Sequence, residues 1–238
     1  MLSLATVLSL CVSSALAAVS FGDATVFSSS TVASPGIFPV GGSGIGNGGF
    51  SLNTEGSLQV GLRAGERFFS DFLSNDGVGG NATYFATAGY SPTSGGDPTP
   101  APPLGSWNYY VHFDARGYTG TVGSLILTVQ ESPNLGGGFF SVDLFSLVPP
   151  SPPGPAVQLL QGSSNLGFAP TLAALGFDAN APGEYEFTLT AFDVTGAPLL
   201  STEMTVEVAA APEPATLIVW SGLAGLCAVG VAVRRKSA

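Results

Sequence analysis

Residues 184–208 read EYEFTLTAFDVTGAPLLSTEMTVEV, two runs of alternating polar and apolar residues with a short connection between them. A period of two is typical of a β-strand with one buried and one solvated face. The connection, Asp193 to Pro198, holds Gly196 where a tight turn needs a positive φ. We therefore predict a β-hairpin. Its buried side chains are expected to be Tyr185, Phe187, Leu189, Ala191, Met204, Val206 and Val208.

The same alternation recurs earlier in the chain, and clusters of Gly, Pro, Asn and Ser separate the runs as turns separate strands. No part of residues 18–211 has the period of a long amphipathic helix, and residues 170–175 are the one short helical candidate. We expect an all-β fold, an antiparallel β-sandwich of jelly-roll or immunoglobulin-like type, although a small barrel has the same pattern of short strands. The earlier runs are residues 57–64, 106–114, 121–131 and 138–148.

Two stretches of low complexity interrupt this pattern, near residues 90–106 and 149–155. The piece between them has about 43 residues, too few to bury a core of its own. We therefore interpret both stretches as long surface loops of a single β domain over residues 18–211. Two separate domains are the alternative.

Charge is scarce in this chain. Only 9% of the residues are charged and the formal net charge is −10, so a nucleic-acid-binding protein and a charged coiled coil are excluded. A hydrophobic content of 45% is enough to build a core. Residues 18–211 hold fifteen acidic residues against Arg63, Arg67 and Arg116, a net charge of −12, which we expect to keep an exported domain soluble.

The first residues have the form of a secretory signal. Residues 1–17 read MLSLATVLSLCVSSALA, with an apolar run over residues 2–12 that is too short to span a bilayer. Ala15 and Ala17 occupy the −3 and −1 positions of an A-x-A cleavage site. We predict an N-terminal signal helix, delivered to the secretion translocon and removed after Ala17.

The last residues have the form of a membrane anchor. Residues 215–233 contain 19 residues without a charge, about 28 Å of helix, close to the thickness of the hydrocarbon core. Arg234, Arg235 and Lys236 follow at once and should stay on the cytoplasmic side. We predict a transmembrane helix that leaves residues 18–211 on the opposite side of the membrane.

Pro212-Glu213-Pro214 stands directly before this apolar stretch. The order of a Pro-Glu-Pro motif, an apolar span and a terminal basic cluster over residues 212–238 resembles the PEP-CTERM sorting signal of bacterial surface proteins. The two prolines also keep the motif extended and accessible, because proline lacks a backbone donor and does not continue a helix. Residues 161–168 and 178–187 resemble a recurring ectodomain of such proteins, which implies no particular activity.

In that family exosortase, a membrane-embedded cysteine protease or transpeptidase, recognises the signal and cleaves near the motif. The resemblance therefore implies an exported precursor held in the inner membrane and then released to the cell surface or extracellular matrix. The implied recognition residues are Pro212, Glu213 and Pro214, and the implied membrane-retention residues are Arg234, Arg235 and Lys236.

Few residues offer catalytic chemistry. Residues 18–211 contain no cysteine, so disulfides, cysteine nucleophiles and thiolate metal sites are excluded there. His112 is the single histidine and lies on the polar face of its run, where we expect a solvated side chain. Glu184 and Glu186 are about 7 Å apart along one strand face, a separation that glycoside hydrolysis tolerates, but that face is the wet one. We expect no catalytic residues.

The residues suggest two kinds of ligand site. Oxygen ligands for calcium occur at loop spacing over residues 71–77 and 178–184, but neither stretch matches the calcium-loop pattern, so we expect no metal site and at most weakly bound calcium. Tyr110 and Tyr118 are the aromatic side chains predicted to be exposed together, and an exposed ring can stack on a sugar. Trp107 and Tyr109 belong to the core face.

These observations predict an exported, exosortase-sorted surface protein with a non-catalytic structural or interaction role and no cofactor. A carbohydrate- or calcium-dependent adhesion module, with exopolysaccharide as its partner, is the alternative. A secreted polysaccharide hydrolase comes third.

Overall fold

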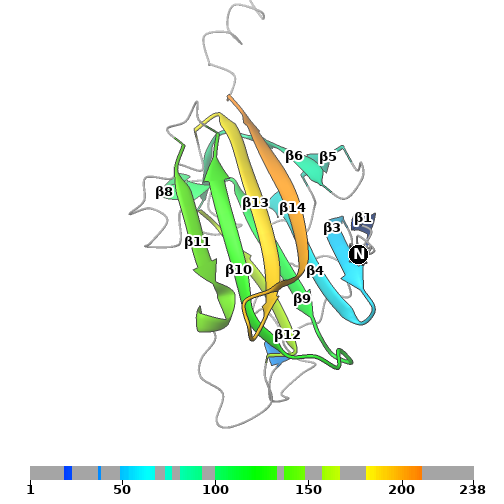
Figure 1. The fold of residues 1–238 in the computed structure, drawn as a ribbon. Helices are drawn as coiled ribbons and strands as arrows, with labels where there is room; N and C mark the ends of the chain where they lie inside the picture. The colour runs from blue at the N-terminus through cyan, green and yellow to red at the C-terminus, as the bar shows by residue number, and fades with distance from the viewer. Residues whose placement is uncertain are drawn as a thin grey trace, which may run out of the picture.

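The computed structural model describes residues 19–22, 37–38, 49–67, 73–76, 81–92, 100–132, 137–147, 157–166 and 181–210, and within them the chain is all β (Figure 1). Sheet 1 has six strands in the order β1 (Val19–Gly22), β3 (Phe50–Glu55), β4 (Leu58–Glu66), β9 (Trp107–Asp114), β12 (Leu159–Ser164) and β2 (Ile37–Phe38). Sheet 2 has the order β11 (Phe139–Asp143), β10 (Val122–Glu131), β13 (Gly183–Asp193), β14 (Pro198–Ala209), β6 (Ala82–Thr87) and β5 (Ser74–Asn75).

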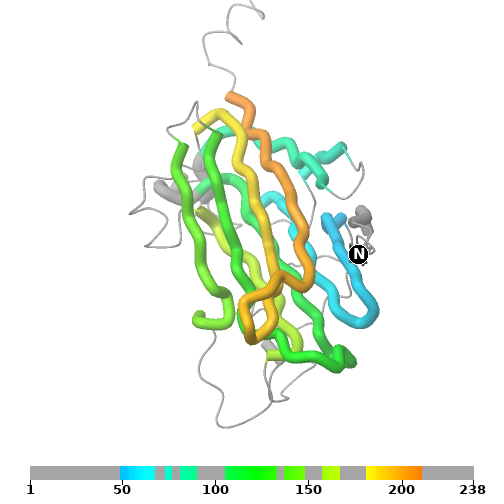
Figure 2. The backbone as a smooth tube through the Cα atoms, in the orientation of Figure 1, coloured from blue at the N-terminus to red at the C-terminus, as the bar shows by residue number. Residues whose placement is uncertain are grey.

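The hairpin at residues 184–208 is confirmed as β13 and β14, which run side by side along sheet 2 (Figure 2). Their register pairs Glu184 with Glu207 and Ala191 with Leu200. The turn forms as its residues predict, because Gly196 has a φ of 86°. The carboxylate of Asp193 also closes it, accepting hydrogen bonds from the backbone N–H groups of Thr195 and Ala197 at 2.8 and 2.9 Å.

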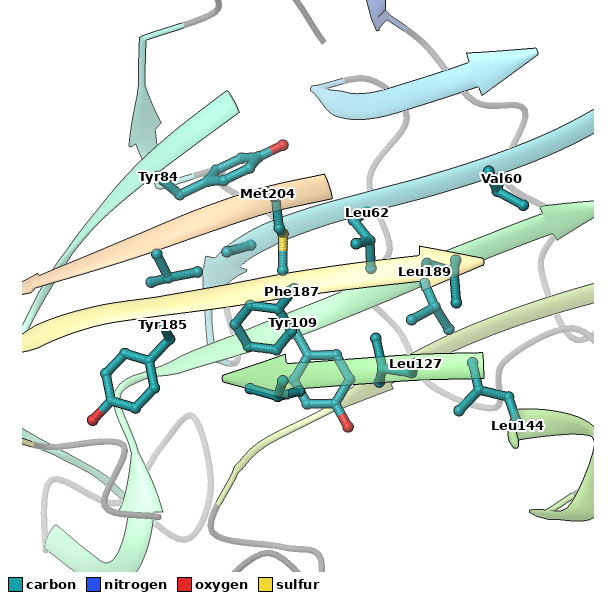
Figure 3. Packing of buried hydrophobic residues seen from close by; sticks show 14 of the residues in the cluster. Val60, Leu62, Tyr84, Tyr109, Leu127, Leu144, Tyr185, Phe187, Leu189 and Met204 are labelled. Atoms are coloured by element: carbon teal, nitrogen blue, oxygen red, sulfur yellow. The ribbon is translucent and has the colours of Figure 1, made fainter. Parts of the chain in front are cut away.

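The core lies between the two sheets and is rich in aromatic rings (Figure 3). Phe187 of β13 has no exposed surface and contacts Tyr109 of β9 with ring centroids 5.3 Å apart. Trp107 lies 5.7 Å from Tyr185 across the same interface. All seven side chains predicted to be buried in the hairpin are buried. Alternation therefore identified the face that sheet 2 turns toward sheet 1.

The four earlier runs also form strands, and one of these strands ends earlier than predicted. Residues 57–64, 106–114 and 121–131 correspond to β4, β9 and β10, whereas residues 138–148 begin as β11 and end in a 3-10 turn over Leu144–Leu147. The strand stops at Asp143 because its carboxylate accepts a hydrogen bond from the backbone N–H of Phe145 at 3.0 Å. This side-chain bond favours a turn over continued extension.

The expectation of wholly antiparallel sheets is wrong. β6 pairs with β14 in parallel, and β2 pairs with β12 in parallel. Both parallel pairs join strands that are far apart in the sequence. Parallel pairing requires this, because the chain must cross back to the starting end of the sheet, which takes a connection of a dozen or more residues.

One predicted loop contains strands, and several other predicted segments lie outside the described residues. The stretch near residues 90–106, predicted to be a loop, contains β7 (Tyr90–Pro92) and β8 (Pro100–Gly105), which form a separate two-stranded sheet. Residues 1–17, 149–155, 170–175 and 212–238 lie outside the described residues. Within the described part of the chain, no helix has the length and apolar character that crossing a membrane requires.

Replacing Phe187 by alanine should lower the free energy of unfolding by about 3–5 kcal/mol, because it removes a fully buried ring and leaves a cavity. Urea unfolding followed by the fluorescence of Trp107 in a Trp220→Phe background measures this loss. Phe139→Ala is the matched control, since Phe139 is 60% exposed and its loss should change stability by less than about 0.5 kcal/mol. Equal effects of the two variants would contradict the packing described.

Candidate functional site

The outer face of sheet 1, which the alternation pattern predicts to be wet, is instead a buried polar layer. His112 is 1% exposed and Tyr110 is 4% exposed, so the expectations of a solvated histidine and an exposed Tyr110 are wrong. Phe50 and Leu52 of β3 lie on the same face and supply its apolar cover. Their side chains cross β4 at Gly61, where a Cβ atom would lie 3.1 Å from Leu52 and 3.2 Å from Phe50.

His112 is held by two glutamine side chains. Gln161 Nε2 lies 2.9 Å from Nδ1 of the ring, and Gln59 Oε1 lies 3.4 Å from Nε2. A neutral imidazole satisfies both contacts by accepting from Gln161 at Nδ1 and donating to Gln59 from Nε2. Burial in this layer lowers the pKa of His112 to about 4. The histidine is therefore a neutral structural group at pH 7.

An ion pair borders the histidine. Arg116 donates hydrogen bonds to both carboxylate oxygens of Asp114, at 2.9 and 2.5 Å. Desolvation pushes the pKa of Asp114 upward, but the hydrogen bonds from Arg116 outweigh it and hold that pKa below its ordinary value. This bidentate pair fixes both charges at the end of β9.

Arg63 carries a charge into the centre of the buried layer. Its side chain is fully buried, and its guanidinium carbon lies 4.5 Å from the ring centroid of Tyr110 and 5.4 Å from that of Phe50. Stacking on two aromatic rings stabilises a guanidinium that has been removed from water. Burial raises the pKa of Tyr110, so its hydroxyl stays protonated. The arrangement stabilises the sheet and offers no accessible nucleophile.

The predicted sugar-stacking pair is therefore not a platform. Tyr110 lies beneath Arg63, and Tyr118 is partly buried against the core and over Gly120. The alternation rule failed for Tyr110 because it assumes that one face of each sheet meets water. A sheet covered on both faces does not obey that assumption.

Asn165 is a structural residue that the sequence pattern does not identify. Its side-chain nitrogen donates to the carbonyl oxygens of Gly105 and Trp107 at 2.9 and 2.7 Å, and its side-chain oxygen accepts from the N–H of Gly105 at 3.0 Å. Asn165 thus ties the end of β12 to the start of β9. Like Gln161, it lies in the stretch 161–168 that resembles a recurring ectodomain.

The acidic candidates lie on the opposite side of the molecule. Glu184 and Glu186 are exposed on the outer face of sheet 2, as predicted, and Glu184 faces Glu207 across the β13–β14 pair. Among the described residues, no group of three or more His, Cys, Asp or Glu side chains is arranged to hold a metal ion. Asp76 Oδ1 accepts a hydrogen bond from the backbone N–H of Thr83 at 3.0 Å, while Asp71 and Asp178 lie outside the described residues.

A pocket of about 300 Å³ opens at the end of the molecule where β4 and β6 both end. Neither alternation nor a motif predicts it, because its walls come from both sheets. The described residues of its lining combine one carboxylate and three hydroxyl groups with apolar surface. The lining residues are Glu66, Leu73, Ser74, Phe85, Thr87, Ala88 and Ser106.

Comparison with protein-family models, with curated proteins and with solved structures finds no match for this chain. The residues of the predicted cleavage and sorting signals, Ala15, Ala17, residues 212–214 and residues 234–236, lie outside the described residues.

The free energy of unfolding should decrease as the pH is lowered, because of His112. The unfolded histidine takes up a proton near pH 6.5 and the folded one near pH 4, so acidification between these values favours the unfolded chain by about 3 kcal/mol in total. Asp114 stays charged over most of this window because its pKa is held below the ordinary value. Urea unfolding at a series of pH values measures the slope.

His112→Gln is the informative control, since glutamine keeps a polar side chain and does not titrate. The variant should be less stable than the wild type at pH 7, and this difference should shrink by about 3 kcal/mol at pH 4. A difference that stays constant across the range would contradict a neutral buried histidine.

Proposed function

We propose that this protein is an exported, non-catalytic cell-surface or extracellular-matrix protein that exosortase sorts through its C-terminal signal. The observation that carries the sorting half is the order of Pro212-Glu213-Pro214, an uncharged stretch of 19 residues and a basic cluster in the last part of the chain. The acidic, cysteine-free segment between the two hydrophobic ends supports export as well, because it needs no reducing compartment.

The ectodomain is proposed to be a β-sandwich of immunoglobulin-like rather than jelly-roll type. β9 and β12 pair in one sheet while β10, β13 and β14 pair in the other, the arrangement of strands B and E against strands C, F and G in that fold. Tyr185 near the start of β13 supports this assignment, since its hydroxyl donates to the carbonyl oxygen of Ala181 at 3.2 Å, as in a tyrosine corner. The fold alone implies no activity.

The proposal that the protein is not an enzyme is supported by the positions of the described polar residues. Three polar side chains of sheet 1 are buried and hydrogen-bonded to other protein groups, so a substrate does not reach them: His112, Gln161 and Asn165. Glu184 and Glu186 lie on the exposed outer face of sheet 2, whereas the two carboxyl groups of a glycosidase flank a bound sugar.

Sorting is tested by the mass of the mature protein in a bacterium that contains exosortase. We expect a chain that begins at Ala18 and ends at or near Glu213. Glu213→Ala should retain the tail, because the recognition motif is changed, while Glu207→Gln on β14 removes a nearby acid outside the motif and should be processed normally. An intact wild-type C-terminus in such a host would refute the proposal.

Catalysis is tested by incubating the protein with a panel of polysaccharides and measuring released reducing ends. We expect no release above that of buffer, because Glu184 and Glu186 lie on an exposed sheet face. Turnover by the wild type that disappears in Glu184→Ala would overturn the non-catalytic assignment and favour a secreted hydrolase.

A further inference from the structure

The pocket at the end of β4 and β6 has walls that hydrogen bonds hold in place. The backbone N–H of Arg67, next to Glu66, donates to the carbonyl oxygen of Ser106 at 2.9 Å. The hydroxyl of Ser106 donates to the carbonyl oxygen of Thr87 at 2.9 Å. The backbone N–H of Ala88 donates to the carbonyl oxygen of Ala209 at 2.8 Å. The Ser106–Thr87 bond links sheet 1 to sheet 2 at the pocket, and the other two bonds continue the strand pairs β4–β9 and β6–β14 on either side of it. A pocket formed in advance loses little conformational entropy when a ligand binds.

Phe85 gives this pocket an accessible aromatic surface. It lies on the outer face of β6, is 43% exposed and pairs across the sheet with Ser74 on one side and Glu207 on the other. Ligand pockets are lined mainly by apolar and aromatic side chains, and Phe85 is the aromatic one among the described lining residues. A planar ring suits the apolar face of a pyranose.

The polar groups of the lining restrict the chemistry of a ligand. Among the described residues of the lining, Glu66 supplies an exposed carboxylate, Ser74, Thr87 and Ser106 supply hydroxyl oxygens, and none is Lys, Arg or His. An anionic ligand would meet a negative charge without a cation to balance it, in a chain whose net charge is −10. A neutral ligand with many hydroxyl groups can donate to the carboxylate and exchange hydrogen bonds with the hydroxyls.

We propose that this pocket binds a neutral hexose unit of a glycan, with Phe85 stacking on the sugar ring and Glu66 accepting hydrogen bonds from its hydroxyl groups. The volume of about 300 Å³ is at the lower end for ligand pockets, which suits a terminal or branching sugar rather than a long enclosed chain. Glu66 is the one carboxylate among the described lining residues, and we therefore expect binding without the acid–base pair that hydrolysis needs.

The test is binding of the purified full-length protein to an array of short neutral gluco-, manno- and galacto-oligosaccharides. The detergent must lack a sugar head group, since such a head group would compete for the pocket. We expect saturable binding to at least one neutral oligosaccharide. Phe85→Ala should weaken it about tenfold, as loss of a central aromatic contact does. Glu66→Gln should weaken it less, because the amide oxygen still accepts hydrogen bonds.

Two matched controls separate the pocket from general surface effects. Phe139→Ala removes a more exposed ring on β11, at the far edge of the same sheet, and Glu186→Gln removes an acid from the same outer face. Both should bind as the wild type does, and the near-ultraviolet circular dichroism of all four variants should match that of the wild type.

Three outcomes would overturn the proposal: no neutral oligosaccharide bound by the wild type, equal losses in Phe85→Ala and Phe139→Ala, or binding only to anionic glycans. The result is independent of sorting, since binding is measured on the unprocessed chain. Failure of glycan binding leaves the sorting proposal standing, and an unprocessed C-terminus leaves the glycan site standing.

Discussion

The packing of aromatic rings between the two sheets is the interaction on which the rest of this structure depends. Phe187 and Tyr185 of β13 meet Tyr109 and Trp107 of β9, with ring centroids 5.3 to 6.1 Å apart and tilted or edge-on geometry. Rings of this size bury large apolar areas and have preferred orientations, so they fix both the distance between the sheets and the register of their strands. Residues 18–211 contain no cysteine and so no disulfide, which leaves the stability to the packing of this core as a whole.

The packing of the core places β9 in the middle of sheet 1 and turns its polar residues away from the core. That second face is also covered, so Arg63 and His112 are buried and depend on specific partners. Polar groups removed from water are tolerated only when paired, and the glutamines at 59 and 161 and the ring of Tyr110 provide the contacts. This face is therefore part of the framework rather than a reactive centre.

Function is left to the surfaces that remain accessible and to the two ends of the chain. The outer face of sheet 2 carries exposed acids, and the pocket beside Phe85 lies where the two sheets end. The export and sorting signals that we propose lie in the two hydrophobic ends, outside the segment that contributes the pocket, so the two proposals can be tested separately.

The sequence by itself determined the runs that form β4, β9, β10 and β11 and the hairpin at residues 184–208, because alternation and turn residues are local properties. The terminal signals, read from apolar length and motif order, stay predictions. Only the tertiary structure decided the parallel pairing of β6 with β14, the burial of Tyr110 and His112, and the contacts of Asn165. It also formed the pocket from Glu66, Phe85 and Ser106, which are distant in sequence. These features depend on which strands become neighbours and on what covers each face of a sheet. The alternation of polar and apolar residues along one strand predicts neither of these.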